Sequence, residues 1–332
     1  MNSRERVRTI ISGQAADRCG FWLGNPKEES WELYHAYWGT RTEEELRRRL
    51  GDDFCWIPAG TYEHPEGKDL FPIPGKHAHG TPGPFADCED VSQVDDYEWP
   101  KLDYLDFTEV LETLRGAGPY YRASGFWTPF YHNVMDLFGM EQYMIKMYTH
   151  PDVVHAVTDH VCNFYYEANE RWFQAAGDLM DGFFFGNDFG TQQDLICGPE
   201  QFDEFIMPWF RKFTAQGKRY GYQVILHSCG SVYKVIDRLI EAGVDCLHPL
   251  QAGAANMHAE KLAREFKGRI AFLGGIDTQQ LLVQATPEEV KADVRRVKDL
   301  LGPALIVSPS HEALLPNVPP ENVEAMAEAA LE

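Results

Sequence analysis

The sequence predicts a closed parallel (β/α)8 barrel, the TIM-barrel class of α/β folds. Short apolar runs alternate with longer amphipathic stretches along the chain, and this alternation is typical of βα units. The apolar runs predict eight strands, over residues 19–23, 53–57, 122–127, 182–186, 222–226, 244–248, 270–274 and 304–308. An open doubly wound sheet would hold about six or seven strands, so the count favours closure.

Helix-end signals between the strands support the same fold class. Residues 151–176 place valines and aromatic residues on one stripe, as expected of a helix that covers a sheet. Thr286 and Glu289 have the spacing of a capping box, and Ser231 is expected to cap a helix over residues 232–242. These helices would form the outer layer of the barrel.

A long connection separates the second and third expected strands. Residues 61–118 are rich in Pro, Gly, His and Asp, and connections of this length are usually functional or capping elements. We therefore expect one barrel domain over residues 1–332 with an irregular excursion at 61–118. If the chain forms a homodimer, we expect this excursion to supply the interface.

Charge and cysteine content exclude several classes of partner. The chain has 30 Lys and Arg against 51 Asp and Glu, a formal net charge of −21, and such a field repels nucleic acids and anionic membranes. Its seven cysteines are scattered without a CxxC pair, which predicts reduced thiols. The charged N-terminus and the lack of long apolar runs predict a cytoplasmic location without a membrane partner.

The most specific candidate site is the segment Val-Ile-Leu-His-Ser-Cys-Gly-Ser at 224–231. TIM-barrel active sites lie at the C-terminal ends of the strands. Residues two apart in extended backbone project to the same side, so His227 and Cys229 can face one ion. An imidazole and a thiolate form half of a zinc site. The alternative is a small buried thiol beside a rim histidine, because two ligands do not define a site.

A third ligand must come from another strand. His311 follows the last expected strand, and a His-Cys-His set would leave one tetrahedral position open, as catalytic zinc sites do. Asp188, Glu312 and Cys246 are competing ligands. His311 alone could equally be a substrate hydrogen-bond donor.

Other polar and aromatic residues follow the expected strands and complete the predicted site. Asp188 follows an apolar run at 183–185 and suits a proton-handling or cation-binding role, although an Asx turn is the alternative. We assign catalytic roles to Asp188, Glu312 and Tyr131, and substrate contacts to Trp127, His132, Asn187 and Gln251. A plain core role for the aromatic residues is the alternative.

These motifs resemble the uroporphyrinogen decarboxylase superfamily, in particular its zinc-dependent corrinoid-linked methyltransferase branch, which includes methylcobalamin:coenzyme M methyltransferases. The resemblance rests on His-Ser-Cys-Gly at 227–230, Leu-Gly-Gly-Ile-Asp-Thr at 273–278 and Ser-Pro-Ser-His at 308–311. It implies zinc at His227 and Cys229, and a corrinoid (methylcobalamin) carried by a partner protein. The branch usually has a cysteine as third ligand, where this chain has Ser310 or His311.

The resemblance implies methyl transfer rather than porphyrinogen decarboxylation. The decarboxylases carry an arginine-rich stretch near the N-terminus, whereas this chain has Glu28 and Glu29 in that region, which would repel a polycarboxylate. The expected substrate is a small thiol, amine or methoxylated compound. Two alternatives stay open: a metal-free decarboxylase-like lyase using Asp188 and His311, and a non-catalytic barrel that partners a methyl-transfer system.

Overall fold

Eight parallel strands form one sheet in the computed structural model, which describes residues 1–73 and 81–332. Residues 74–80, part of the predicted excursion, lie outside the described residues. The strands are β1 Gly20–Phe21, β2 Phe54–Pro58, β5 Tyr121–Gly125, β6 Gly182–Gly186, β7 Gln223–His227, β8 Cys246–His248, β9 Ala271–Ile276 and β10 Leu305–Pro309. Each of the eight predicted strands is present, with bounds shifted by a few residues.

The sheet closes on itself as a barrel. Its strand order is β1-β10-β9-β8-β7-β6-β5-β2, with parallel pairing throughout. The two end strands meet where the Asp53 N–H donates to the Phe21 carbonyl at 2.9 Å. The predicted (β/α)8 TIM barrel is confirmed.

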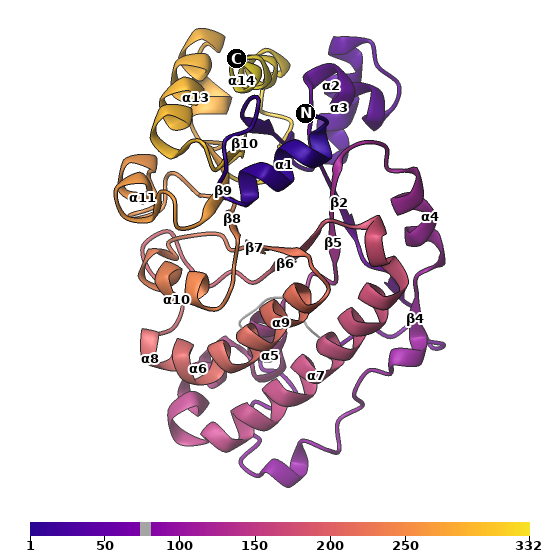
Figure 1. The fold of residues 1–332 in the computed structure, drawn as a ribbon. Coiled ribbons are helices and arrows are strands. Elements are labelled where there is room, and N and C mark those ends of the chain that lie inside the picture. Colours follow the sequence, from indigo (N-terminus) through magenta and orange to yellow (C-terminus); the bar gives the residue numbers. More distant parts are fainter. Residues whose placement is uncertain (74–80) are drawn as a thin grey trace.

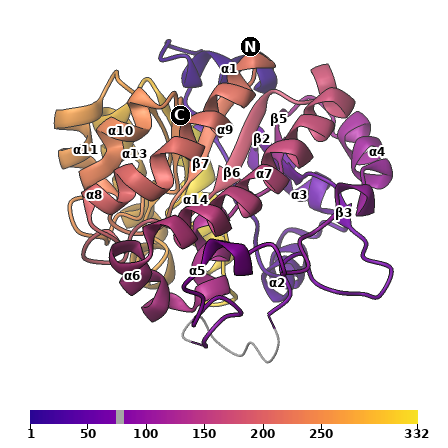
Figure 2. The same cartoon turned by 90° about the horizontal axis from the view of Figure 1, so that it is seen from below.

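Helices surround the strands (Figures 1 and 2). They are α1 Ser3–Ile11, α2 Glu28–Trp38, α3 Glu43–Leu50, α4 Thr108–Gly116, α5 Phe130–Phe138, α6 Met140–Thr149, α7 Pro151–Ala176, α8 Pro199–Gln201, α9 Met207–Arg219, α10 Ile236–Glu241, α11 Ala259–Phe266, α12 Leu281–Gln284, α13 Pro287–Leu301 and α14 Pro320–Leu331. The helix predicted over 151–176 is confirmed as α7, and Thr286 and Glu289 form the predicted capping box of α13.

Two local predictions need correction. The excursion 61–118 is not irregular throughout, because β3 Thr61–Tyr62 pairs antiparallel with β4 Leu105–Asp106 and α4 follows. A ribbon of two-residue strands is too short to show an alternating pattern in sequence. Ser231 does not cap a helix: its hydroxyl donates to the Ala255 carbonyl at 2.7 Å, and α10 begins only at Ile236 after a 3-10 turn.

The barrel interior is filled by side chains that alternate along the strands, as in other closed barrels. At the N-terminal end α1 closes the barrel with Val7, Ile10 and Ile11, which join the interior core. Aromatic residues of the same core lie further along the strands, among them Trp22 and Phe184. Side chains of α1 and aromatic residues of the strands therefore fill the barrel interior together.

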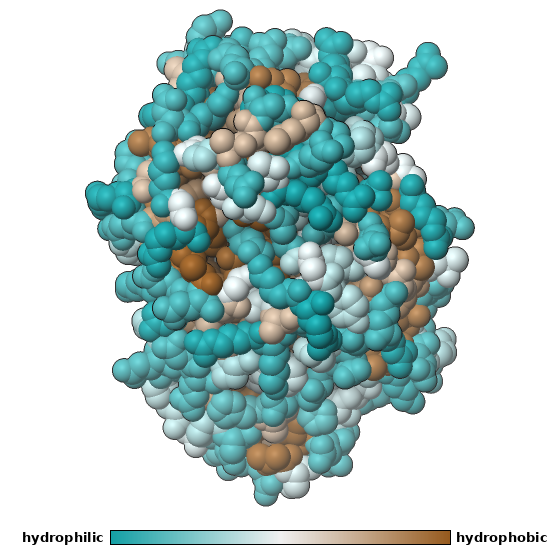
Figure 3. All heavy atoms as spheres, viewed as in Figure 1, coloured by the Kyte–Doolittle hydropathy of each residue, from teal (hydrophilic) through white to brown (hydrophobic). Residues whose placement is uncertain are grey.

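The surface seen in Figure 3 is mostly hydrophilic, with small separate apolar patches. Among the residues that the structure describes, none of the helices has the length and apolar content that crossing a membrane requires.

A buried ion-pair network fixes α1 to the barrel. Asp53 has a fully buried side chain and accepts hydrogen bonds from Arg6 at 2.7 Å and from Arg18 at 2.6 Å. Its carboxylate also accepts from the Phe21 N–H at 3.2 Å. One carboxylate thus joins α1, β1 and β2 where the two end strands meet.

We expect Asp53→Ala to lower the free energy of unfolding by about 3–5 kcal/mol, because Arg18 loses its carboxylate partner and the buried Arg6 guanidinium keeps only Asp17. The measurement is urea denaturation followed by circular dichroism. Asp103→Ala is the matched control, since this carboxylate is 87% exposed and pairs with Arg171 at 3.4 Å, and exposed pairs contribute little. Equal stability of the two variants would show that the network does not hold α1.

Candidate active site

The end of β7 and the turn after it position His227 and Cys229. His227 is the last residue of β7 and is buried. Its carbonyl accepts from the Asn187 N–H at 3.0 Å, and the next residue donates its N–H to the His248 carbonyl at 2.8 Å. Gly230 adopts φ +80°, and a Cβ there would lie 2.4 Å from the Gly190 carbonyl oxygen. Only glycine fits this close approach, which turns the chain directly after Cys229.

An imidazole, a thiol and a carboxylate converge at this turn. The His227 Nε2 lies 3.4 Å from the Cys229 Sγ and 3.3 Å from the Asp188 Oδ1. Asp188 also accepts a hydrogen bond from the Cys229 N–H at 2.8 Å. One ligand atom from each of the three residues lies within 4.8 Å of the other two, which is the spacing of a possible metal site.

The other ring nitrogen of His227 faces a second set of groups. Its Nδ1 lies 3.0 Å from the His248 Nδ1 and 3.5 Å from the Glu312 Oε2. The Glu312 Oε2 and the His248 Nε2 are buried and have no hydrogen-bond partner among the described residues. His227, His248 and Glu312 also satisfy the 4.8 Å criterion, so both candidate groups share His227.

These contacts shift the pKa values of the cluster in opposite directions. Burial alone would lower the pKa of His227, but the charges of Glu312, Asp188 and Cys229 outweigh it and hold the pKa well above its usual value. Burial would raise the pKa of Asp188, yet His227 brings it down to about 2. The Cys229 thiol is similar: burial opposes ionisation, but hydrogen bonds with His227 and His311 give a lowered pKa. Burial lowers the pKa of His248 well below its usual value.

His311, the predicted third metal ligand, lies beside this cluster on a more exposed loop. Its ring centroid is 6.4 Å from that of His227, and its Nδ1 accepts the Ala313 N–H at 3.0 Å. Among the described residues it belongs to neither group that meets the 4.8 Å criterion. With Gln251, which accepts the Gly230 N–H at 2.8 Å, it lines a cavity of about 510 Å³.

Of the residues predicted after β5 and β6, His132 lies near the cluster, whereas Asn187 and Tyr131 pack behind it. His132 is close enough to Asp188 to help lower its pKa. Asn187 is buried, and its amide group accepts from the Tyr131 N–H at 3.0 Å and donates to the Thr128 carbonyl at 2.9 Å. The ring of Tyr131 packs against Tyr143 and Phe189. Asn187 and Tyr131 therefore lie in the packing behind the cluster.

A small aromatic cavity adjoins the cluster on the Glu312 side. It has a volume of about 290 Å³ and is lined by Trp22, Asn25, Trp56, Trp127, Phe184 and Glu312. The ring centroid of Trp127 is 4.9 Å from that of His227, and that of Trp22 is 5.2 Å from that of His248. The sequence prediction included Trp127 and Glu312 but missed Trp22, Trp56 and Phe184. Aromatic residues inside apolar runs resemble core, and only strand register shows which of them face the barrel mouth.

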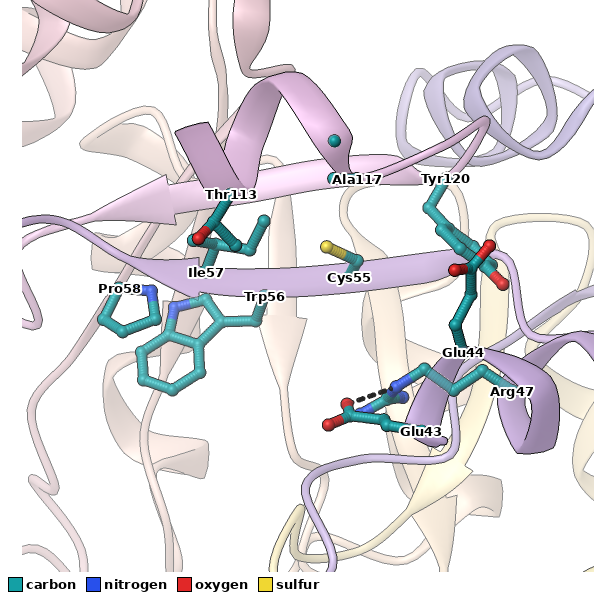
Figure 4. A pocket seen from close by; sticks show the side chains of 11 residues that line it. Glu43, Glu44, Arg47, Cys55, Trp56, Ile57, Pro58, Thr113, Ala117 and Tyr120 are labelled. Atoms are coloured by element: carbon teal, nitrogen blue, oxygen red, sulfur yellow. Dashed lines mark hydrogen bonds and ion pairs between the residues drawn. The ribbon is translucent and has the colours of Figure 1, made fainter. Parts of the chain in front are cut away.

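A larger cavity lies on the outside of β2, away from His227. It measures about 560 Å³, and its lining includes Cys55, Arg47 of α3 and Thr113 of α4. Figure 4 shows Cys55 and Trp56 on opposite sides of β2. Arg47 is engaged there by Glu43 at 2.7 Å and by Asp52 at 2.7 Å. Among the described residues that line this cavity, the one Lys or Arg side chain is therefore already paired, and the candidate catalytic groups lie at the barrel mouth instead.

The fold and the cluster define a parallel βα barrel with an imidazole, a thiol and a carboxylate at its mouth. The profile of the family described as Uroporphyrinogen decarboxylase (URO-D) matches residues 77–332, and the chain belongs to this family. This match confirms the resemblance that the sequence motifs indicated.

Two solved structures are similar to this chain. A methyltransferase from Methanosarcina mazei has a TM-score of 0.69 and 16% identity, over 99% of this chain and 98% of that chain. A putative vitamin-B12 independent methionine synthase from Listeria monocytogenes has a TM-score of 0.45 and 11% identity, over 95% and 96%. At such identities the likeness concerns the fold alone. No functionally curated protein sequence matches the chain.

We expect Cys229 to be the most reactive thiol of the metal-free protein. The thiolate is the nucleophile, and Cys229 has a lowered pKa, whereas burial raises the pKa of Cys19 to about 11 and that of Cys55 to about 12. Its alkylation rate should rise with pH and level off below the usual thiol pKa. The measurement is iodoacetamide labelling at several pH values with peptide mass spectrometry.

Two controls accompany this labelling. His227→Ala removes one hydrogen bond that favours the thiolate, so it should slow the labelling of Cys229 near neutral pH. Labelling of Cys55 should stay unchanged in this variant. Faster labelling of Cys19 or Cys55 than of Cys229 in the unmodified chain would contradict the prediction.

Proposed function

We propose that this chain is a methyltransferase that moves a methyl group between a corrinoid on a partner protein and a small thiol, amine or methoxylated compound, with zinc at the barrel mouth. The observation that carries the proposal is the convergence of His227, Cys229 and Asp188 within 4.8 Å, beside a small cavity. Membership of the URO-D family and the fold likeness to a methyltransferase from Methanosarcina mazei support it.

The residues present fit a zinc ion by their chemistry. Imidazole nitrogen, thiolate and carboxylate are the usual protein ligands of zinc. A zinc-binding histidine normally engages its second ring nitrogen in a hydrogen bond that orients the ring. The His227 Nδ1 has such a partner in His248 at 3.0 Å, with Glu312 as an ion-pair partner at 3.5 Å, and its Nε2 faces Cys229 and Asp188.

Distance favours one of the two candidates for the third ligand. The sequence predicted His311, and this assignment stays a prediction. Asp188 places a ligand atom within 4.8 Å of those of both His227 and Cys229, whereas His311 hydrogen-bonds the Cys229 thiol without completing such a group among the described residues. We therefore favour Asp188 as the third ligand and His311 as a group at the rim. Three protein ligands would leave one coordination position for substrate, as catalytic zinc sites do.

When bound, zinc would supply Lewis acidity, which stabilises a substrate thiolate or helps an ether or amine leaving group depart. The chain's own residues would orient the metal-binding histidine and shield the reacting atoms. His248 and Glu312 hold the tautomer of His227, and the aromatic cavity excludes water from the reacting atoms. A cavity of about 290 Å³ limits the substrate to a small molecule, since ligand pockets generally span about 300–1,000 Å³.

A decarboxylase-like lyase without metal is the second candidate, favoured by the family match over residues 77–332. It would use Asp188 as the charged group and His311 as a donor. The aromatic cavity argues against a polycarboxylate, because its charged lining residue is the acidic Glu312. Protein that binds no zinc would favour this lyase, or a non-catalytic partner of a methyl-transfer system.

We expect the purified chain to hold about one zinc ion, as a site with three protein ligands and an open position does. His227→Ala and Cys229→Ala should each lose it, because each removes a ligand. Cys55→Ala is the matched control, since this thiol lies on the outside of β2, and it should keep the metal. The measurement is elemental analysis of each variant after dialysis.

The same analysis separates the two candidate third ligands. Loss of zinc in Asp188→Asn but not in His311→Ala would support Asp188, and the reverse would support His311. Methyl transfer itself is followed by the absorbance change of free methylcobalamin with a small thiol. Zinc retained in both His227→Ala and Cys229→Ala would overturn the proposed site.

A further inference from the structure

Four aromatic rings line the cavity of about 290 Å³ at the barrel mouth. The rings of Trp56 and Trp127 meet at 68° with centroids 5.3 Å apart, and those of Trp22 and Phe184 meet at 70° and 6.0 Å. Phe184 also contacts Trp56 at 71° and 6.2 Å. Neighbouring rings at such angles contact each other edge to face, so the lining is a box of rings in several orientations rather than a flat stack.

One carboxylate, Glu312, and one amide, Asn25, complete the lining of this box. Glu312 is 20% exposed by its side chain, and its buried Oε2 accepts no hydrogen bond from any described residue. Of the residues that the structure describes, no Lys or Arg lines the cavity. A negative charge and four electron-rich rings thus surround a space that holds no cationic side chain.

We propose that this cavity binds the methylated ammonium group of a tertiary or quaternary amine, which makes amines the substrate class; its role as a substrate site rests on the proposed function. The faces of aromatic rings attract cations, and quaternary ammonium groups are bound in aromatic cages. An apolar methylated cation also loses little hydration on burial compared with a compact ammonium. Glu312 supplies the opposite charge at close range.

The charges around the cavity are consistent with a cationic ligand even beside a metal. The Asp188 carboxylate and the Cys229 thiolate would together balance the two positive charges of zinc. With His227 neutral on the metal, Glu312, which lies 3.5 Å from its Nδ1, keeps a negative charge that can face the ligand. At longer range the net charge of −21 attracts small cations toward the protein.

The shape of the cavity distinguishes an ammonium group from the other two classes in the proposed function. A thiol needs no aromatic walls, because its sulfur is the group that is recognised. A methoxylated aromatic ring could pack edge to face on these walls, but it carries no positive charge to pair with Glu312. A compact group with methyls in several directions matches a box with steep walls.

Calorimetric titration of the whole chain, with zinc and after chelation, tests the proposal with three probes: choline, its neutral carbon isostere 3,3-dimethyl-1-butanol, and methoxybenzene. We expect choline to bind at least about tenfold more tightly than the isostere, from cation–π attraction and the carboxylate. Glu312→Gln should weaken choline binding and leave the isostere unchanged. Glu321→Gln, an exposed glutamate of α14, is the matched control and should bind choline as the unmodified chain does.

Trp56→Leu keeps an apolar wall but removes a ring, so it should also lower the preference for choline over the isostere. Circular dichroism checks that each variant folds. If a variant does not fold, the comparison of the three probes on the unmodified chain still tests the proposal. Equal binding of choline and the isostere, tighter binding of methoxybenzene, or no choline binding would overturn the proposal. If the chain binds choline but holds no zinc and transfers no methyl group, the proposed function is overturned and this inference about the cavity is not. If the chain transfers a methyl group to a thiol but does not bind choline, this inference is overturned and the proposed function is not.

Discussion

The buried imidazole of His227 organises the barrel mouth, because its two ring nitrogens face two different sets of groups. Cys229 and Asp188 lie on the Nε2 side, and His248 and Glu312 lie on the Nδ1 side. A neutral imidazole has one proton to place. With that proton on Nδ1, the Nε2 lone pair faces the thiol and the carboxylate, which is the form that binds a metal. In the doubly protonated form the same ring pairs with both carboxylates and holds the cluster together.

Closure of the barrel is what allows this arrangement. Asp188 and His248 reach His227 from the neighbouring strands β6 and β8, whose registers pair Gly186 with His227 and His227 with His248. Glu312 comes from the loop after β10, three strands further along the sheet order. In an open sheet that loop would lie well away from β7, because neighbouring strands are about 4.8 Å apart. The network around Asp53, which joins β1 to β2, thus supports the site from the opposite end of the barrel.

The sequence was sufficient for the strands and for the His-x-Cys turn, because apolar runs and residue spacing are local properties. It was insufficient where the partner of a side chain lies far along the chain. The Ser231 hydroxyl was expected to cap a helix, yet it donates to the Ala255 carbonyl, 24 residues away. Trp22 and Phe184 look like core residues in their apolar runs, and only closure and register place them beside His227. Asp188 and Glu312 were named from sequence, but which side of His227 each one faces depends on the fold.

Family membership alone does not determine the reaction, since one barrel supports many chemistries through its rim. At this rim the acidic and thiol groups are Asp188, Cys229 and Glu312, and the imidazoles are His227, His248 and His311. A cavity lined by aromatic rings and a carboxylate disfavours polyanionic substrates, because burying a carboxylate there would require an unpaired negative charge beside Glu312. Small neutral or cationic molecules carry no such penalty. Asp188 and Cys229 thus suit a divalent metal, Glu312 selects the ligand beside it, and His227, which contacts all three, links metal binding to substrate choice.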